Sequence, residues 1–402
     1  MTRKLSFCLI IALLLQSLTV FGVMGVSAEE AEEEHNRSEQ ARIDLAPDAE
    51  SAVLMDMDTG KILYEKNSDT PLPPASITKI MSMLLIMEAI DEGKVNWNDK
   101  VRTSERAASM GGSQIFLEVG EEMTVEDLMK GVAIASGNDA TVALAEHIAG
   151  TEENFIQMMN DRAQELGMEN THFVNTNGLP APGHETTARD IAVMSRELMK
   201  HEEITRFTGV YEDYLREESD KPFWLVNTNR LVKFYDGMDG LKTGYTSEAQ
   251  YCLAATAKRG DMRLIAVVMG APSPKKRNEH ITSMMDYAFS QYETHPIHKE
   301  GDVVGKVKVD KGAQTEAELV VPHQISVLTE KGKSTDQFVT TVEPHPNLTA
   351  PIKKGDLLGS VKIEKDGQVE TEVQIVATED IPRASFWQLS KRILTTLFGI
   401  LP

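Results

Sequence analysis

The stretch Pro74-Ala75-Ser76-Ile77-Thr78-Lys79 is followed at once by the apolar run IMSMLLIM at residues 80–87. A proline pair ahead of an uninterrupted helix-forming segment predicts a loop that leads into a buried helix, with Ser76 in its first turn. Residues three apart on a helix share one face, with about 5–6 Å between their Cβ atoms. The Lys79 amine can therefore reach the Ser76 hydroxyl, which places a base one helical turn from a nucleophile.

The Ser-x-x-Lys pattern is weak evidence when taken alone. The amide N–H groups of a helix's first turn carry partial positive charge, equivalent to roughly half a proton charge, and this favours a developing alkoxide. However, the pattern also occurs at residues 273–276, where a proline lies inside it and no apolar run follows. We expect a solvated loop there. Without further motifs, Ser76 is equally well explained as a serine near a helix start beside a surface lysine.

Length and charge limit the class of protein. The 402 residues suffice for two or three domains. Lysine and arginine total 41 against 62 aspartates and glutamates, which gives a formal net charge of -21. Nucleic acid is excluded as a partner, because binding to phosphates requires a basic face.

The first residues indicate export. Two positive charges in residues 1–4 precede an apolar run at 7–18, and Val26-Ser27-Ala28 offers small residues for cleavage. We predict a signal peptide at residues 1–28 and an acidic leader at 29–45. Removal of the signal peptide takes Cys8 with it and leaves Cys252 without a disulfide partner, as a core residue of an apolar strand.

Two further stretches carry polar side chains within apolar surroundings. Residues 125–144 have a helical pattern that Ser136-Gly137-Asn138 interrupts. This interruption predicts a tight turn between two helices, with the Ser136 and Asn138 side chains directed into a cavity. A simple helix cap is the alternative.

Later in the chain, residues 239–245, 251–257 and 263–269 are predicted to form antiparallel strands. Lys242, Thr243 and Gly244 on the first strand offer a cation, a hydroxyl and a position without Cβ, beside which a substrate backbone can lie. An edge strand with a solubilising lysine is the alternative.

His184 beside Glu185 raises the question of a metal. The sequence has no His-Glu-x-x-His pattern and no partner at ligand spacing, so we predict a structural role for His184 and no metal site. Thr187 is expected to cap a helix that starts at Ala188.

The pattern of apolar and polar residues changes in the last hundred residues. Residues 296–380 alternate apolar with polar positions between short turns, which predicts a small all-β domain without a catalytic site. At residues 382–402, apolar side chains recur at helical spacing around Lys391 and Arg392. This segment is too short and too charged to span a bilayer, so we expect an amphipathic helix in the membrane interface, with Trp387 at headgroup depth. A helix packed on the β domain is the alternative.

The motifs together resemble a known family. Ser-x-x-Lys at Ser76, Ser-x-Asn at Ser136 and Lys-Thr-Gly at Lys242 follow in the order of penicillin-recognising serine enzymes. Residues 112–117, 170–173 and 187–190 extend the resemblance to low-molecular-mass D-alanyl-D-alanine carboxypeptidases of the penicillin-binding protein 5 type (peptidase S11). The resemblance implies an α/β (α+β) fold: a catalytic domain at residues 46–295, with an antiparallel sheet that holds both its ends and a helical lobe behind Ser76.

The resemblance also implies a substrate and a chemistry. Ser76 attacks the carbonyl between the two D-alanines of a peptidoglycan stem peptide, and unprotonated Lys79 accepts its proton. A lysine can act as a base near neutral pH only when burial and nearby positive charge, here Lys242, lower its pKa to roughly 7–8. Ser136 passes a proton to the departing amine, and Asn138 binds both the substrate amide and Lys79.

The remaining expected contacts hold the substrate. Lys242, Thr243 and Arg277 bind the terminal carboxylate beside Gly244, and the backbone N–H groups of Ser76 and Tyr245 hold the oxyanion. Water then hydrolyses the Ser76 ester, and β-lactams form the same ester. The expected partners are the stem peptide, β-lactam antibiotics and the outer face of the cytoplasmic membrane. No cofactor is expected.

Three alternatives remain at this point. A class A β-lactamase shares the three motifs, although the Glu-x-x-Leu-Asn loop that places its water does not occur between Asn138 and Lys242. A D,D-endopeptidase or transpeptidase acts on the same type of bond and is hard to separate by sequence. A catalytically silent β-lactam or wall-binding receptor would have no need to keep Ser76 and Lys79.

Overall fold

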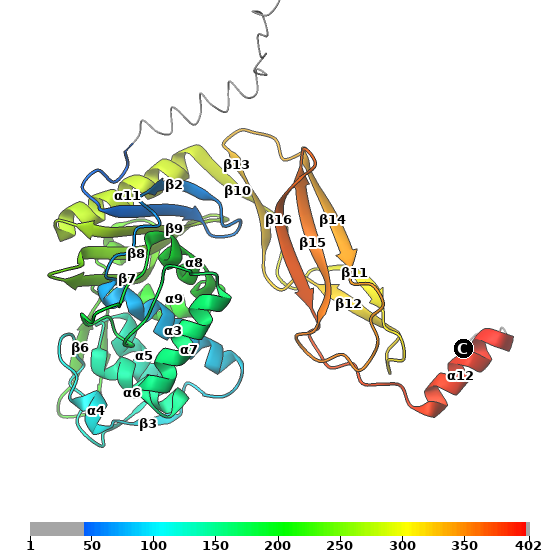
Figure 1. Ribbon diagram of the computed structural model, residues 1–402, viewed down its shortest axis with the longest axis horizontal. Coiled ribbons are helices and arrows are strands. Elements are labelled where there is room, and N and C mark those ends of the chain that lie inside the picture. Colours follow the sequence, from blue (N-terminus) through cyan, green and yellow to red (C-terminus); the bar gives the residue numbers. More distant parts are fainter. Residues whose placement is uncertain (1–43, 399–402) are drawn as a thin grey trace, which may run out of the picture. The chain divides into compact units, whose positions relative to one another are not determined.

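The computed structural model describes residues 44–398 (Figure 1). The expected signal peptide, the leader up to residue 43 and the last four residues of the tail lie outside the described residues. Within them, the expected fold is confirmed: an antiparallel sheet with helices, then a run of strands and a terminal helix.

Residues 46–295 contain a five-stranded antiparallel sheet in the order β2-β1-β9-β8-β7. Strand β1 pairs with β9, so the first and last strands of this part are neighbours at the centre of the sheet. The strands that were expected at 239–245, 251–257 and 263–269 are confirmed as β7, β8 and β9. The sheet consists of β1 (Ser51–Asp56), β2 (Ile62–Lys66), β7 (Met238–Thr246), β8 (Gln250–Arg259) and β9 (Met262–Ala271).

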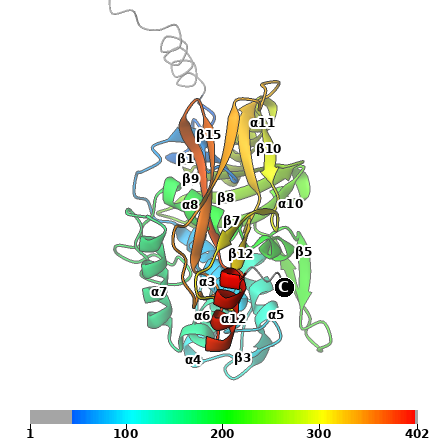
Figure 2. The same cartoon turned by 90° about the vertical axis from the view of Figure 1, so that its right-hand side faces the viewer.

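Helices cover both faces of this sheet. Helix α11 packs on β8 and β9 from one side, and α8 packs on β1 and β9 from the other. A larger group of helices around α3 forms a lobe next to the sheet (Figure 2). The helices are α3 (Lys79–Asp91), α4 (Glu105–Ala108), α5 (Val125–Ala133), α6 (Asn138–Ala149), α7 (Glu152–Glu165), α8 (Ala188–Leu198), α9 (Thr205–Thr208), α10 (Leu231–Phe234) and α11 (Pro274–Gln291), with 3₁₀ turns η1 (Ala75–Thr78) and η2 (Glu202–Ile204).

Helix α3 lies at the centre of the lobe because it is apolar on every side. Ten of its thirteen residues are buried, as expected for a helix without a polar face. The start of this helix differs from the prediction. The α-helix begins at Lys79, and Ser76 lies in the preceding 3₁₀ turn η1, which Ala75 enters with a φ of 48°. The turn brings Ser76 to the surface of the lobe instead of into the α-helix.

The second Ser-x-x-Lys copy was predicted wrongly. It is not a solvated loop but the first turn of α11, in which the Ser273 hydroxyl accepts a hydrogen bond from the Lys276 amide at 3.2 Å. Proline is tolerated at Pro274 because the first helical position needs no N–H donor. We had treated this proline as a helix breaker, and therefore missed an eighteen-residue helix.

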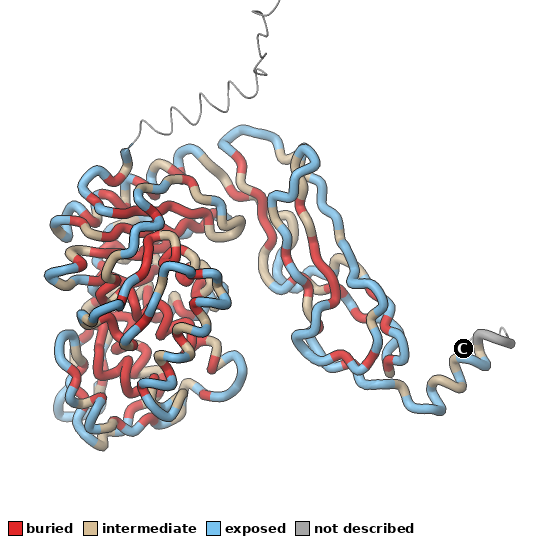
Figure 3. The backbone as a smooth tube through the Cα atoms, viewed as in Figure 1, coloured by how far each residue is buried: buried red, intermediate tan, exposed pale blue. Residues whose placement is uncertain are grey.

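The segment after α11 contains only strands up to the terminal helix among the described residues. Its core is formed by alternate side chains of β11, β12, β13, β15 and β16, and Figure 3 shows the buried stretches inside these strands. The strands are β10 (Tyr292–His298) paired with β13 (Ile325–Glu330), β11 (Val303–Lys308) with β12 (Glu316–Val320), and a sheet of β14 (Phe338–Pro344), β15 (Leu357–Lys365) and β16 (Gln368–Val376). Two small antiparallel strand pairs within residues 46–295 join β3 (Lys100–Arg102) to β4 (Glu122–Thr124) and β5 (Glu212–Leu215) to β6 (Phe223–Val226).

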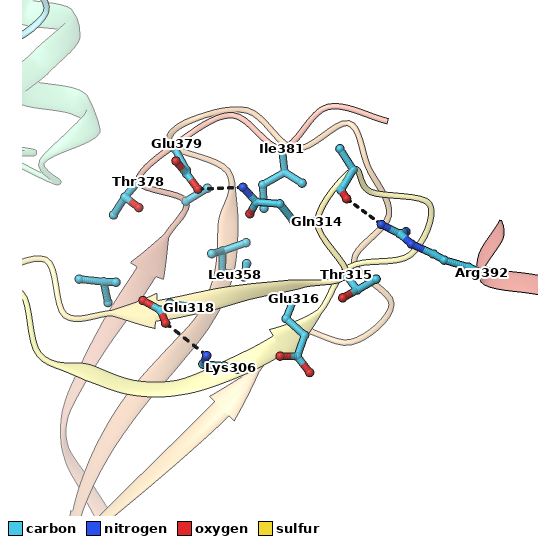
Figure 4. Close-up of a pocket in the computed structure, with 14 residues that line it drawn as sticks. Lys306, Gln314, Thr315, Glu316, Glu318, Leu358, Thr378, Glu379, Ile381 and Arg392 are labelled. Atoms are coloured by element: carbon cyan, nitrogen blue, oxygen red, sulfur yellow. Dashed lines mark hydrogen bonds and ion pairs between the residues drawn. The ribbon is translucent and has the colours of Figure 1, made fainter. Parts of the chain in front are cut away.

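Helix α12 (Phe386–Phe398) confirms a helix in the tail. Arg392 donates hydrogen bonds to the carbonyl oxygens of Gly312 and Ala313, at 2.8 and 2.7 Å. Figure 4 shows this arginine reaching from the helix to the rim of a cavity of about 540 Å³ in the β domain. In the part of the chain that the structure describes, no helix is long and apolar enough to cross a membrane.

Candidate active site

A chain of buried hydrogen bonds through Thr78 and His184 fixes the turn that carries Ser76. The Thr78 hydroxyl donates to the Ala75 carbonyl oxygen at 2.8 Å. His184 Nδ1 accepts from the Val174 amide, so its Nε2–H donates to the Thr78 hydroxyl at 2.8 Å. Burial and the nearby His172 lower the pKa of His184 to about 4, which keeps the imidazole neutral. His184 thus has a structural role, because it connects the Val174 amide to the Thr78 hydroxyl. Among the described residues, no group of three metal-ligating side chains occurs.

Lys79 contacts three oxygen atoms. Its Nζ lies 3.0 Å from the Ser76 hydroxyl oxygen, 2.7 Å from Asn138 Oδ1 and 2.7 Å from the carbonyl oxygen of Asn177. A neutral amine has two N–H donors and one lone pair. The two carbonyl-type oxygens accept both donors, since neither oxygen can donate a hydrogen bond, and the lone pair is left for the hydroxyl proton of Ser76.

The surroundings of Lys79 favour this neutral form. The amine is fully buried, and its pKa lies well below the ordinary 10.5, first because burial penalises the charged form and second because Lys242 is nearby. The carboxylate of Asp139 acts in the opposite direction and raises the pKa. The first two effects outweigh the third.

The turn between α5 and α6 presents Ser136 and Asn138. Ser136 has a φ of 63°, a left-handed conformation that turns the chain sharply before α6 begins at Asn138. The Asn138 side-chain amide donates to the Gly111 carbonyl oxygen at 2.6 Å, which fixes the orientation of Oδ1 toward Lys79. Asp139 stabilises the turn, because its buried carboxylate accepts from the backbone amides of Ile115 and Leu117 at 3.1 Å.

Strand β7 passes in front of Ser76. Lys242 is buried, and its Nζ donates to the carbonyl oxygen of Thr243 at 3.0 Å. Burial, and then the charge of Arg277, lower the pKa of Lys242 to about 7. The position of Gly244 requires glycine, because a Cβ there would lie 2.9 Å from the Pro74 carbonyl oxygen.

Arg277 reaches the same place from α11. It is buried, and burial lowers its pKa to about 10, at which it remains charged at neutral pH. Its guanidinium donates to the Asn278 side-chain oxygen at 2.9 and 3.0 Å. Arg277 was predicted as a site residue, although helix α11, which carries it, was not predicted.

These residues meet at one cleft of about 830 Å³. Its charged lining residues are all basic, and the hydroxyls of Ser76 and Ser136 open into it. The structure therefore brings all nine predicted site residues together, with Lys79, Asn138 and Lys242 directly behind the lining formed by Ser76, Ser136, Thr243, Gly244, Tyr245 and Arg277.

Sequence reasoning missed two members of the site. The carbonyl of Asn177 binds Lys79, yet a backbone group has no residue-type signature. The Asn177-Gly178 pair was the available signal. Gly178 has a φ of 86°, and a Cβ there would lie 1.8 Å from the Ala75 carbonyl oxygen, so glycine lets this loop pack directly against the Ser76 turn. The second is Asp139, which supports the Ser136 turn.

Comparisons with known proteins agree with this geometry. A family model described as D-alanyl-D-alanine carboxypeptidase matches residues 35–273, and one described as penicillin-binding protein 5, C-terminal domain, matches residues 292–383. The chain is 58% identical over 351 residues to D-alanyl-D-alanine carboxypeptidase DacF of Bacillus subtilis (strain 168), across 87% of this chain and 90% of that protein.

Two solved structures are also similar. Penicillin binding protein 5 from Haemophilus influenzae has a TM-score of 0.65 and 32% identity, and the match covers 84% of this chain and 98% of that one. Penicillin-binding protein D2 from Listeria monocytogenes, solved in an ampicillin-bound form, has a TM-score of 0.54 and 32% identity over 60% of this chain and 98% of its own. A serine hydroxyl 3.0 Å from a buried lysine amine in a basic cleft, and matches across most of the sequence, lead to one conclusion: the chain belongs to the D-alanyl-D-alanine carboxypeptidase family.

Proposed function

We propose that this protein removes the terminal D-alanine from peptidoglycan stem peptides that end in D-Ala-D-Ala, through an ester on Ser76. The observation that carries the proposal is the contact of 3.0 Å between Lys79 Nζ and the Ser76 hydroxyl oxygen, within a set of contacts that leaves the amine lone pair for that hydroxyl.

Acylation follows from these contacts. The Ser76 oxygen attacks the carbonyl carbon between the two D-alanines while its proton moves to Lys79 Nζ. The negative charge that develops on the carbonyl oxygen is held by the backbone N–H groups of Ser76 and Tyr245, and losing one such donor typically costs about 3 kcal/mol of barrier. When the C–N bond breaks, the proton passes through the Ser136 hydroxyl to the departing amine of D-alanine.

The basic lining of the cleft suits a substrate that ends in a carboxylate. The Thr243 hydroxyl and the cations of Lys242 and Arg277 surround the position for this group. A buried arginine offers two parallel N–H donors to a carboxylate, which fixes its orientation as well as its position. This binding presents the preceding peptide bond to Ser76.

Deacylation returns the free enzyme. A water molecule adds to the ester carbonyl while Lys79 accepts one of its protons, and the C–O bond to Ser76 then breaks as Lys79 returns this proton to the Ser76 oxygen, which releases the shortened peptide as a carboxylic acid. A β-lactam ring offers a strained amide at the same place, so penicillins form an ester with Ser76 that retains the leaving group.

Labelling by a fluorescent penicillin tests the nucleophile. The wild-type protein is expected to take up the label, and Ser76→Ala is expected to lose it while its circular dichroism spectrum is unchanged. Ser273→Ala, in the other Ser-x-x-Lys copy, is the matched control and keeps the label. Labelling of Ser76→Ala would mean that another residue is the nucleophile.

Release of D-alanine tests the reaction. We expect release from a synthetic stem pentapeptide, together with slow loss of bound penicillin. Efficient β-lactam turnover without D-alanine release would favour a β-lactamase, and cleavage of cross-linked dimers in preference to pentapeptide would favour a D,D-endopeptidase.

The tail supports a second part of the proposal, that the protein works at the outer face of the cytoplasmic membrane after export. Arg392, on the polar side of α12, is bound to the β domain. Several apolar side chains of the described part of the helix are exposed: Phe386 at 75%, Trp387 at 79% and Ile393 at 59%. An amphipathic helix with an exposed apolar side binds the interface of a bilayer. The proposal thus assigns catalysis of the reaction to residues 46–295, the β domain to residues 296–380 and the membrane anchor to residues 382–402.

Vesicle binding tests the anchor. Truncation after Asp380 is expected to free the protein from lipid vesicles without changing peptide hydrolysis. Ile393→Glu/Leu394→Glu should release the full chain, whereas Gln388→Glu/Thr395→Glu adds the same charge to other positions of the helix and should release it less. Unchanged vesicle binding by the truncated protein would reject the anchor.

A further inference from the structure

A second cavity, of about 490 Å³, adjoins the catalytic turn. Ala75 forms part of its wall, and so does Gly178, whose loop packs directly on Ala75. Opposite them lie Thr246 and Glu248, at the end of β7 and in the turn that follows it. The cavity therefore begins where β7 leaves the catalytic cleft.

The direction of a bound stem peptide follows from the site. In the proposed reaction its terminal carboxylate lies beside Thr243 and Arg277 and its scissile carbonyl lies next to Ser76, which lines the same cleft as Gly244. An extended peptide advances by about 3.3 Å per residue, as does the strand beside it. The penultimate residue then lies beside Tyr245, and the third residue from the end lies beside Thr246, at the mouth of the second cavity.

The second cavity is lined by negative charge. Among the described residues that line it, the charged side chains are Glu185 and Glu248, and neither carboxylate forms an ion pair within the described part of the chain. His184 at its base is neutral at physiological pH because burial and His172 lower its pKa. The catalytic cleft is basic, so the two adjoining cavities have opposite charge.

The walls of the cavity are stiff. Proline residues contribute on both sides, in the segments 71–74 and 180–182, and proline has a fixed φ. Glu185 is held by backbone hydrogen bonds to His172, at 2.9 and 3.1 Å. The backbone at Glu185 thus belongs to a framework with little freedom, as suits the recognition of a side chain of defined length.

We propose that this cavity is a specificity subsite for a free amino group on the stem residue that precedes D-Ala-D-Ala, with Glu185 and Glu248 as its two carboxylate partners. The inference rests on the proposed function, and it adds that the enzyme distinguishes stems by the charge of this residue. An amine that is acylated, as in a cross-linked stem, is neutral and loses this interaction. The subsite therefore favours stems that are not cross-linked at this residue.

Two synthetic pentapeptides test the subsite, one with lysine before D-Ala-D-Ala and one with Nε-acetyl-lysine. For the full wild-type chain we expect kcat/KM for D-alanine release to favour the lysine peptide by about three- to tenfold, since exposed ion pairs are individually weak. This preference should shrink at high salt. Glu185→Gln/Glu248→Gln should abolish the preference by slowing the lysine peptide alone. The matched control Glu330→Gln/Glu370→Gln removes two charges from β13 and β16 and should retain the preference.

The outcomes separate the subsite from the reaction. Equal kcat/KM for the two peptides in the wild type, or a preference that survives in Glu185→Gln/Glu248→Gln, would overturn the subsite and leave the carboxypeptidase reaction intact. Failure of the wild type to release D-alanine from either peptide would overturn the proposed function, and the subsite with it. Equal slowing of both peptides by the double variant would assign these glutamates to the structure of the loop and not to specificity.

Discussion

The carbonyl oxygen of Asn177 accepts a hydrogen bond of 2.7 Å from Nζ of Lys79. The same loop is pressed against the Ser76 turn through Gly178. The loop at 175–179 therefore helps to position the Lys79 amine, although it contains none of the three family motifs. It also forms part of the wall of the second cavity.

Gly178→Ala should disable the site. A Cβ there would lie 1.8 Å from the Ala75 carbonyl oxygen, so the loop must move by more than an ångström and take the Asn177 carbonyl away from Lys79. A misplacement of about 1 Å can cost 10²-fold in rate. We expect the second-order rate of acylation by fluorescent penicillin to fall by about that factor.

Gly183→Ala is the matched control for that change. Gly183 also has a positive φ, of 77°, but its added Cβ meets nothing within 4 Å. Both variants carry the backbone strain, of about 1–2 kcal/mol, and only one carries the clash. Equal acylation rates for the two variants would show that the contact with Ala75 has no part in catalysis.

Removal of the Lys242 charge should shift the pH profile of acylation. Lys242 lowers the pKa of Lys79, so Lys242→Gln raises this pKa and leaves more of the base protonated at pH 7. The acid limb of the acylation rate then moves to higher pH. Lys275→Gln removes an exposed charge from the rim of the cleft and should leave the limb in place. An unmoved limb in Lys242→Gln would refute the electrostatic role.

Burial of Lys242 should lower the free energy of unfolding of the protein. Its pKa is about 7 in the folded protein and 10.5 as an ordinary value, so the unfolded chain binds more protons between these limits. The free energy of unfolding therefore rises with pH across this window, and the cost of burial is fully present below it. Each pKa unit corresponds to about 1.4 kcal/mol, and we expect Lys242→Met to be more stable than the wild type by roughly 2–4 kcal/mol at pH 7.

Urea denaturation at several pH values measures this difference. The advantage of Lys242→Met should diminish as pH rises from 7 toward 10. A variant that is less stable than the wild type at pH 7 would contradict the burial cost.

Asn138→Asp should slow acylation through the new charge beside Lys79, in addition to the loss of the hydrogen bond that the side-chain amide donates to Gly111. The substitution keeps the shape of the side chain but sets a carboxylate 2.7 Å from Lys79 Nζ. An opposite charge at such a distance favours the protonated amine and therefore raises its pKa. We expect the acylation rate at pH 7 to fall by at least tenfold and to recover partly toward pH 10. A rate that is equally low at every pH would assign the loss to geometry instead.

The fold was predictable where the pattern is periodic or the motif is ordered. The break at Ser136 and the three strands that begin with the Lys242 strand each left a clear signature. The start of α3 was misjudged because a 3₁₀ turn and an α-helical turn have the same sequence preferences. Helix α11 was missed because Pro274 was interpreted as a breaker, although it occupies the one helical position that suits proline.

The site was predictable in its side chains but not in its backbone. Ser76, Lys79 and Asn138 belong to spaced motifs, whereas the Asn177 carbonyl depends on how a distant loop folds over α3. The adjoining cavity could not be predicted either. Glu185 and Glu248 are 63 positions apart in the sequence, and only the fold brings both to one cavity.

The protonation state of Lys79 is the most direct test of the account. A ¹³C NMR titration of the lysine Cε resonances, with the Lys79 signal assigned by its absence in Lys79→Arg, measures the pKa of this amine in the full protein. We predict a pKa well below the ordinary 10.5, because burial and Lys242 disfavour the charged amine. A pKa at or above 10.5 would mean that Lys79 cannot accept the Ser76 proton, and would contradict the mechanism.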